Sequence, residues 1–265
     1  MAQTSLDVVA MITGLGGGLA LFIYGMRKMT EALKTVAGAG LKDILATLTT
    51  NRFTGALSGA LITAVIQSSS VTTVMVVGFV SAGLMTFTQS VGVILGANMG
   101  TTITAQIIAF QVAKYSLIMI ALGFLVELLA RSQRVRHYGI ALMGLGLLFF
   151  GMELMSNASA PLRSYAPFIE AMQDLRNPAM GVLAGFLFTA VVQSSSATTG
   201  VVIVLGAQGF IPLEAGIALI LGANIGTCVT AILSALGRPR EAVKAAAVHV
   251  VFNLAGVLLW IWFIP

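Results

Sequence analysis

Two segments of the chain place one glutamine and three consecutive serines among strongly apolar neighbours. Residues 63–73 read TAVIQSSSVTT, and residues 189–199 read TAVVQSSSATT. Four polar residues in a row spread around a helix, so they cannot all face one packing partner. Their amide and hydroxyl groups can donate hydrogen bonds to an anion or offer oxygen atoms to a cation. The doubled QSSS tract therefore predicts a site that binds small ions.

A second polar motif follows each QSSS tract at the same distance. Residues 96–102 read GANMGTT, and residues 222–228 read GANIGTC. Glycine permits backbone conformations that other residues avoid, and a helix broken at membrane depth leaves N–H and C=O groups that need partners. We therefore expect helix breaks at residues 67–70, 96–102, 193–196 and 222–228. The residues expected to support the breaks in the second motif are Asn98, Gly100, Asn224 and Gly226.

The two ends of such a break differ in their chemistry. A helix that starts after QSSS directs free N–H groups and a partial positive charge at a bound anion. The arm that ends there offers carbonyl oxygens, which suit a small hard cation. Residues 53–113 contain no Asp, Glu, Lys, Arg or His, and residues 177–237 contain only Glu214. Because no basic side chain lies within the breaks to balance an anion, we expect co-bound cations, and sodium fits neutral oxygen ligands of this kind.

The composition determines where these motifs lie. Of the 265 residues 58% are hydrophobic and 9% are charged, and the mean hydropathy is +0.99. Soluble domains carry about 25% charged residues, so the chain belongs in a lipid bilayer. Its net charge of +5 indicates basic loops beside a membrane rather than a nucleic-acid partner. The single cysteine, Cys228, excludes an internal disulfide, and no nucleophile–histidine–acid set indicates an enzyme.

The chain repeats itself with an offset of 126 residues. Adding 126 maps Gln67 onto Gln193, and 17 of the 39 positions in 67–105 are identical in 193–231. Two homologous halves that build one site between them are common in secondary transporters. The elements expected in the first half are a spanning helix at 8–27, a surface helix at 29–50, two arms at 53–67 and 70–84, a broken helix at 87–98 and 101–111, and a helix at 114–130.

The basic residues indicate how the halves are oriented. The two QSSS arms can form a hairpin that enters and leaves on one face of the membrane. Each half then crosses the membrane three times, so the second half is inverted relative to the first. Eleven basic residues then share one face: Arg27, Lys28, Lys34, Lys42, Arg52, Arg131, Arg134, Arg136, Arg238, Arg240 and Lys244. Only Lys114, Arg163 and Arg176 lie on the other. The positive-inside rule places the larger set in the cytoplasm, whereas arms that crossed separately would remove the asymmetry.

The predicted fold class is an all-α polytopic membrane protein. It consists of two inverted-topology repeats, each with a re-entrant helical hairpin and an unwound transmembrane helix. Residues 1–130 form the first repeat, residues 131–137 a cytoplasmic connecting loop, and residues 138–265 the second repeat. Together they form one transport domain in the plasma membrane, with the basic loops in the cytoplasm and both termini outside.

QSSS followed by GANxGT in both halves resembles the type II sodium-dependent phosphate (Na/Pi) cotransporter family in its bacterial form. The resemblance covers essentially the whole length. It implies a phosphate site formed by Gln67, Ser68, Ser69, Ser70, Gln193, Ser194, Ser195 and Ser196. It also implies a sodium site at Gln193, Ser194, Ala223, Thr227 and Thr230, where Ala223 replaces the serine of many members and offers only its backbone carbonyl. By internal symmetry, the candidates for a second cation site are Gln67, Ser68, Thr101 and Thr104.

The resemblance implies a secondary transporter that moves inorganic phosphate with sodium by alternating access, without an organic cofactor. Gly83 stands where electrogenic animal members carry an acidic residue, which is similar to the electroneutral members. The implied partners are phosphate, Na+, the lipid bilayer, a second copy in a homodimer, and a PhoU-like regulatory domain or protein. Three alternatives stay open: the same architecture carrying sulfate, arsenate or a carboxylate; an anion channel; and a non-transporting membrane subunit.

Overall fold

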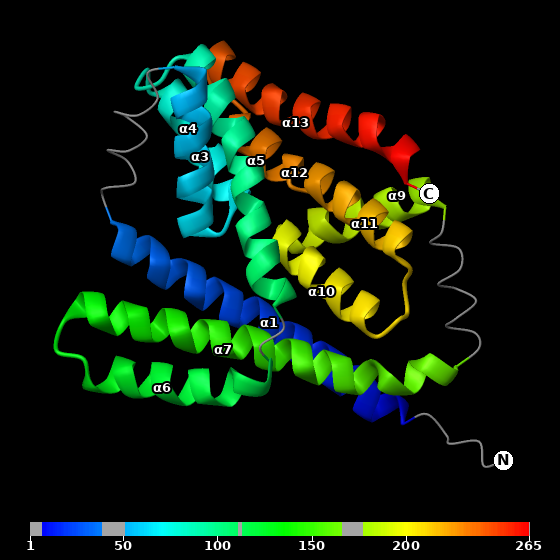
Figure 1. Ribbon diagram of the computed structural model, residues 1–265. Helices are drawn as coiled ribbons and strands as arrows, with labels where there is room; N and C mark the ends of the chain where they lie inside the picture. The colour runs from blue at the N-terminus through cyan, green and yellow to red at the C-terminus, as the bar shows by residue number, and fades with distance from the viewer. Residues whose placement is uncertain (1–6, 39–50, 111–112, 166–176, 265) are drawn as a thin grey trace.

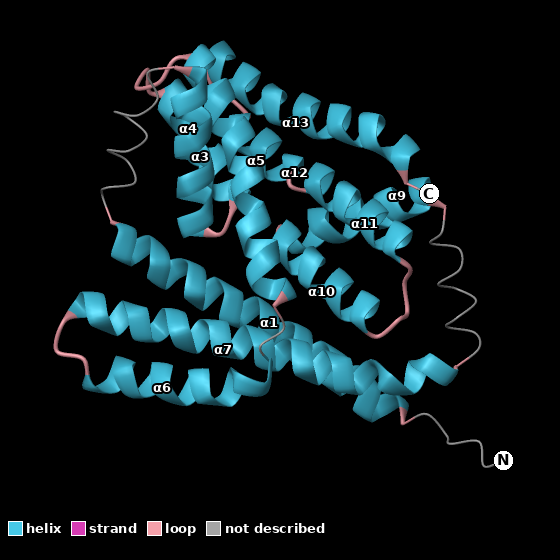
Figure 2. Cartoon of the chain, in the orientation of Figure 1, coloured by secondary structure: helices cyan, strands magenta, loops and turns pink. Residues whose placement is uncertain are grey.

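The computed structural model describes residues 7–38, 51–110, 113–165 and 177–264, and the described residues form helices joined by short turns (Figure 2). The α-helices are α1 (Val8–Ala37), α3 (Arg52–Ile66), α4 (Ser69–Ser81), α5 (Phe87–Ala109), α6 (Ser116–Leu129), α7 (Gln133–Ser159), α9 (Pro178–Val192), α10 (Ser195–Ala207), α11 (Leu213–Gly226), α12 (Cys228–Ala235) and α13 (Arg240–Trp260). Short 3-10 helices cover Ala113–Tyr115, Ala160–Ser164 and Ile261–Phe263. The predicted all-α fold is confirmed.

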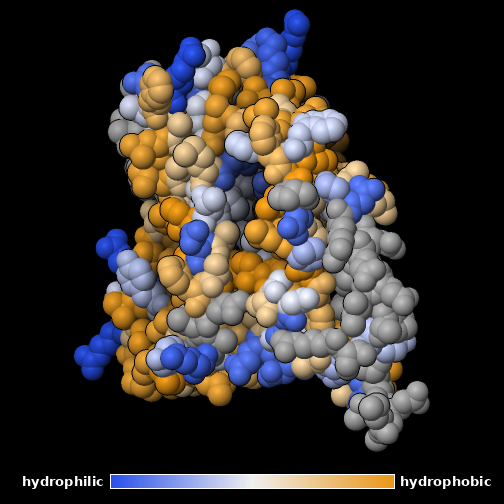
Figure 3. Space-filling model, turned by 45° about the vertical axis from the view of Figure 1, so that its right-hand side comes forward, coloured by the Kyte–Doolittle hydropathy of each residue, from blue (hydrophilic) through white to orange (hydrophobic). Residues whose placement is uncertain are grey.

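Five segments are long and apolar enough to cross a membrane. They are Val8–Ala37, Phe87–Ala109, Gln133–Leu162, Leu213–Ala235 and Arg240–Phe263. Hydrophobic side chains cover much of the face shown in Figure 3, with hydrophilic residues among them at its edges and near its middle. A multi-pass membrane protein follows from these helices.

The internal repeat reappears in the positions of the helices. The offset of 126 residues carries the bounds of α3 onto those of α9 and the bounds of α4 onto those of α10. It carries the span of α5 onto that of α11 and α12 together, from Leu213 to Ala235. The sequence repeat is therefore also a repeat of structure.

Each hairpin starts at an asparagine that caps its first arm. Asn51 Oδ1 accepts hydrogen bonds from the Phe53 and Thr54 N–H groups at 2.9 Å. Asn177 Oδ1 accepts one from the Ala179 N–H at 3.0 Å. Asparagine is among the most favourable N-cap residues, because its oxygen satisfies an N–H that the helix leaves free. The arms that follow contain 15 and 13 residues in each half, fewer than the roughly 20 needed to cross the hydrocarbon core.

Helices α1 and α7, which are equivalent in the two halves, pack against each other in opposite directions (Figure 1). A methyl group on Gly18 would lie 2.8 Å from the Gly151 carbonyl oxygen, and one on Gly25 would lie 2.5 Å from the Gly144 oxygen. The offset of 126 converts Gly18 into Gly144 and Gly25 into Gly151. The two contacts are therefore equivalent under the offset of 126 residues.

The helix predicted to break at residues 96–102 is continuous, which corrects the sequence analysis. α5 runs through the GANMGTT motif without interruption, and in the second half only Thr227 separates α11 from α12. The glycines serve packing instead. A methyl group on Gly96 would lie 1.9 Å from the Ala56 oxygen of α3, and one on Gly222 would lie 2.0 Å from the Val182 oxygen of α9.

Two further boundaries differ from the sequence prediction. α1 continues as one helix to Ala37 instead of ending near residue 27, because none of the following residues as far as Ala37 is a Gly or Pro that would interrupt it. The rest of the expected surface helix, residues 39–50, lies outside the described residues. Residues 133–137, expected in the connecting loop, form the start of α7.

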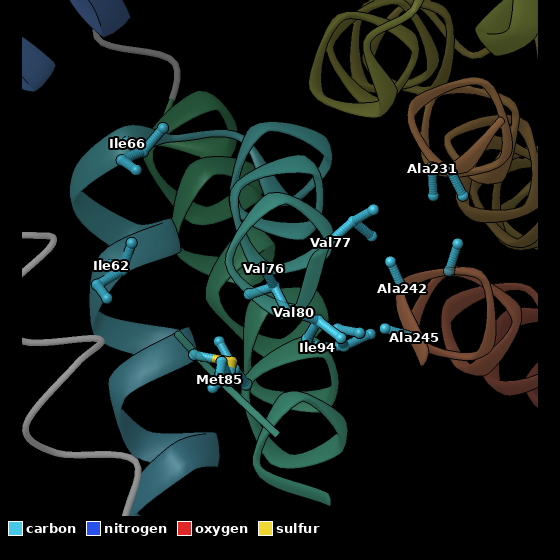
Figure 4. Close-up of a cluster of buried hydrophobic side chains, with 13 residues drawn as sticks. Ile62, Ile66, Val76, Val77, Val80, Met85, Ile94, Ala231, Ala242 and Ala245 are labelled. Carbon is cyan, nitrogen blue, oxygen red and sulfur yellow. The ribbon is translucent and has the colours of Figure 1, made fainter. Parts of the chain in front are cut away.

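The cores join the two halves. One cluster packs Val76, Val77 and Val80 of α4 against Ala231 of α12 and the first turns of α13 (Figure 4). Another joins α1 and α7 to α10 through buried residues such as Phe22, Phe149 and Ala197. Each hairpin is thereby held by elements that belong to the other half.

Candidate functional site

The QSSS tract forms the turn of each hairpin, and its residues have separate structural roles. Gln67 and Gln193 have φ angles of 60° and 59°, in the left-handed region that non-glycine residues rarely adopt. They end the first arms, and their N–H groups donate to the carbonyl oxygens of Thr63 at 2.6 Å and Thr189 at 2.7 Å. The predicted break is confirmed, but it involves only the Gln and the first Ser of each tract.

The first serine of each tract caps the second arm. Ser68 Oγ accepts a hydrogen bond from the Val71 N–H at 3.3 Å, and Ser194 Oγ accepts one from the Ala197 N–H at 3.2 Å. The first N–H groups of α4 and α10 have no carbonyl partner within their own helices. Each tip therefore presents free N–H groups and the positive end of a helix dipole.

A threonine pair closes each hairpin near its tip. Thr63 Oγ1 donates to Thr72 Oγ1 at 2.9 Å, and the equivalent hydroxyls of Thr189 and Thr198 lie 2.5 Å apart. All four side chains are buried. This bond between the arms fixes the position of the tip relative to both.

The two tips line one cavity of about 350 Å³, together with one face of α1. The α3–α4 turn and the start of α10 both lie toward the middle of the molecule, on the same side of α1 (Figure 1). All the residues predicted for the anion site contribute to this cavity: Gln67, Ser68, Ser69, Ser70, Gln193, Ser194, Ser195 and Ser196. Segments 126 residues apart in sequence thus meet in space.

Charged side chains also line this cavity, which corrects the expectation of an uncharged site. Arg27, Glu31 and Lys34 of α1 face it, beside Ile23, Met26 and Thr30. The charge-free stretches of sequence do surround the tips, but α1 comes from elsewhere in the chain. The spacing of Arg27, Glu31 and Lys34 indicates that they share one face of a helix. The sequence does not show that this face meets the tips, because the contact depends on tertiary packing.

Of the residues expected to bind sodium in the second half, Thr230 contacts the glutamine of the tip. Thr230 Oγ1 donates a hydrogen bond to Gln193 Oε1 at 2.6 Å. Thr227 is buried and its hydroxyl donates to the Asn224 carbonyl at 2.7 Å. The carbonyl of Ala223, also buried, accepts the Thr227 N–H at 3.2 Å. Ser194 follows Gln193 in the same tip, so the Thr230 bond links α12 to this tip.

The equivalent residues in the first half differ in burial and in hydrogen bonding. Gln67 Oε1 and Thr104 Oγ1 are buried, and neither has a hydrogen-bond partner among the described residues. Their counterparts in the second half, Gln193 Oε1 and Thr230 Oγ1, bond to each other. Thr101 donates to the Ala97 carbonyl at 3.3 Å. A buried oxygen without a partner costs about 1–3 kcal/mol, so each of these two atoms would be stabilised by a bound partner.

The residues expected to support helix breaks have other surroundings. Asn98 lies within the continuous α5, half-buried, and its Nδ2 has no partner among the described residues. Asn224 precedes the interruption at Thr227. Gly100 and Gly226 pack on the hairpins, because methyl groups there would lie 2.7 and 2.6 Å from the Cβ atoms of Thr63 and Thr189. Both glycines therefore pack against the threonine pairs that close the tips.

Fold and site together define a polytopic helical membrane protein in which two matching hairpins share one polar cavity. The chain matches the Na+/Pi-cotransporter family over residues 21–157 and 166–264, and it belongs to that family. This membership places it among transporters rather than enzymes.

Similar proteins occur in bacteria and animals. The protein YqeW of Bacillus subtilis (strain 168) is 31% identical over 242 residues, which cover 91% of this chain and 78% of the relative. The putative inorganic phosphate export protein YjbB of Escherichia coli (strain K12) is 27% identical over 247 residues, or 93% of this chain and 46% of the relative. The sodium-dependent phosphate transport protein 2C of Homo sapiens is 46% identical over 85 residues, or 31% of this chain and 14% of the relative.

The chain thus spans about half the length of the YjbB protein that it matches. No solved structure matches it.

Proposed function

We propose that the chain transports inorganic phosphate together with sodium, and that phosphate binds between the two QSSS tips. The observation that carries this proposal is the single cavity lined by both tips. The names of the relatives support the substrate, because one is a putative inorganic phosphate exporter and another a sodium-dependent phosphate transport protein.

The geometry of the tips suits a tetrahedral oxyanion. Each tip offers the free N–H groups at the start of a helix, together with the hydroxyls of its serines. Helix N-termini favour phosphate because their N–H groups and dipole both point at the anion. Two such termini facing one cavity can donate to different oxygens of the same ion, which makes binding depend on both halves of the chain.

Sodium would bind beside the phosphate, through neutral oxygens. The candidates in the second half are Gln193, Ser194, Thr227 and Thr230, with the carbonyl of Ala223. The candidates in the first half are Gln67, Ser68, Thr101 and Thr104. Cations that prefer oxygen ligands fit such a set, and a bound cation would separate Gln193 Oε1 from the Thr230 hydroxyl. Sodium and phosphate at adjacent positions would then stabilise each other.

Alternating access follows from inverted halves. Helices α1 and α7 are equivalent and antiparallel, so in inverted halves the hairpins that follow them would enter from opposite faces of the membrane. Arms of 13 to 15 residues are too short to cross a bilayer, which supports re-entrant hairpins. The basic residues around α1, the α6–α7 turn and the start of α13 would face the cytoplasm of a cell whose plasma membrane holds the chain.

Uptake into proteoliposomes tests the function. The purified protein is reconstituted, and labelled phosphate uptake is measured with and without an inward sodium gradient. We expect saturable uptake that requires the gradient and is reduced by unlabelled phosphate more than by sulfate. Equal, non-saturable flux without sodium would indicate an anion channel instead, and stronger competition by sulfate or a carboxylate would indicate another substrate.

A further inference from the structure

One wall of the cavity consists of a charged face of α1 that neither the QSSS tracts nor the cation candidates include. Arg27, Glu31 and Lys34 line it together with Ile23, Met26 and Thr30. These positions recur at intervals of three and four residues, so they occupy one side of the helix. Among the described residues, none of the three charged side chains is in an ion pair closer than 4 Å, although Glu31 and Lys34 attract each other electrostatically.

Arg27 lies at the level of a hairpin tip. The neighbouring residue, Met26, accepts a hydrogen bond at its Sδ from Ser194 Oγ at 3.7 Å. Arg27 itself is exposed to the cavity, so its guanidinium is free to approach an ion held by the serines. A guanidinium matches two oxygens of a phosphate at once, which a hydroxyl or a single N–H cannot do.

We propose that Arg27 is a phosphate-binding residue of the site between the tips, and that Glu31, one helical turn further along, opposes anion binding there. This inference rests on the proposed function. The positive charge that meets the anion then comes from α1 as well as from sodium. Lys34 extends the positive potential toward the end of α1 and raises the local concentration of anions at the opening.

The charged residues of this wall are not repeated in the second half of the chain. The offset of 126 residues carries Arg27 to Glu153, Glu31 to Asn157 and Lys34 to Ala160 on or directly after α7. Glu153 and Asn157 line a separate cavity between α7 and α10. The hairpins are therefore nearly equivalent in their polar groups, whereas the helices beneath them carry opposite charges. An arginine contributes to the anion site from α1 alone.

Equilibrium binding of labelled inorganic phosphate to the purified, detergent-solubilised protein tests the proposal. Arg27→Gln should raise the dissociation constant about tenfold or more, as for loss of a hydrogen bond between charged groups. Glu31→Gln should lower it severalfold, because the repulsion of the anion is removed. Lys28→Gln is the matched control: Lys28 lies 5.6 Å above the ring of Tyr24, outside the cavity, and its loss should change the constant less than twofold.

The opposite signs separate electrostatics from damage to the fold, since a merely structural role would weaken binding in both variants. Weaker binding in Glu31→Gln, or equal constants in Arg27→Gln and Lys28→Gln, would overturn the proposal. Loss of binding in Ser194→Ala with Arg27→Gln unaffected would overturn it and leave the QSSS site intact. A wild-type protein that binds no phosphate would contradict the proposed function itself, and this inference with it.

Discussion

At the scale of single residues, the QSSS tract is built as much for turning the chain as for binding. The glutamine adopts a left-handed conformation and the first serine caps the next helix, so two of the four residues define the tip. The sequence predicted the position of this turn because serine is a favoured N-cap and polar residues interrupt an apolar run. The left-handed glutamine could not be foreseen, since this conformation favours glycine and asparagine.

Removing the capping hydroxyl should impair transport more than stability. Ser68→Ala and Ser194→Ala should each reduce sodium-driven phosphate uptake about tenfold, while the lost cap costs about 1 kcal/mol of stability. Ser90→Ala is the control, because Ser90 is fully buried in α5 and its hydroxyl bonds only to the Phe87 carbonyl of its own helix. Wild-type uptake in both tip variants, with thermal unfolding close to wild type, would exclude the tips from the mechanism.

Loss of a threonine hydroxyl should act on sodium rather than on phosphate. Thr230→Val and Thr104→Val keep the shape of the side chain but remove an oxygen, so we expect the sodium concentration at half-maximal uptake to rise about tenfold. Thr13→Val serves for comparison, since the Thr13 hydroxyl bonds to the Val9 carbonyl at 2.7 Å, far along α1 from the tips. If only Thr230→Val shifts the sodium dependence, the first-half cation site is wrong.

At the scale of elements, the glycines of the GANxGT motifs hold the hairpins. The sequence indicated the helices, the arms and their turns, because apolar runs and caps are local signals. It predicted helix breaks at the glycines because glycine weakens a helix. The helix does not break there, because these glycines allow the backbones of α5 and α3 to pack closely. The contact depends on a partner helix, which local sequence does not reveal.

Alanine at these glycines should therefore unfold the protein at lower temperature. In Gly96→Ala the added methyl would lie 1.9 Å from the Ala56 oxygen, so the helices must separate at a cost of at least about 1–3 kcal/mol. Gly78→Ala, in α4, meets no atom within 4 Å and should be neutral or slightly stabilising. Thermal unfolding of the two variants in detergent makes the comparison. Equal melting temperatures would contradict a packing role for Gly96.

At the scale of the whole molecule, the hairpins of both repeats line one cavity, and the equivalent helices α1 and α7 pack against each other. The offset of 126 residues was enough to predict that both halves supply one site. Arg27 was missed because it lies outside the repeated motifs and reaches the tips only through the packing of α1. The expectation of a cavity without charged side chains was therefore wrong, as α1 adds two cationic side chains and one carboxylate to its lining.

The number of phosphate ions bound per chain tests most directly whether the two tips share one site. Saturation binding with labelled phosphate should give one ion per chain, and Ser68→Ala or Ser194→Ala alone should weaken binding of that one ion. This result is expected because both tips line a single cavity. Two phosphate ions per chain, with each variant removing one of them and leaving the other unchanged, would show two independent sites and contradict the account.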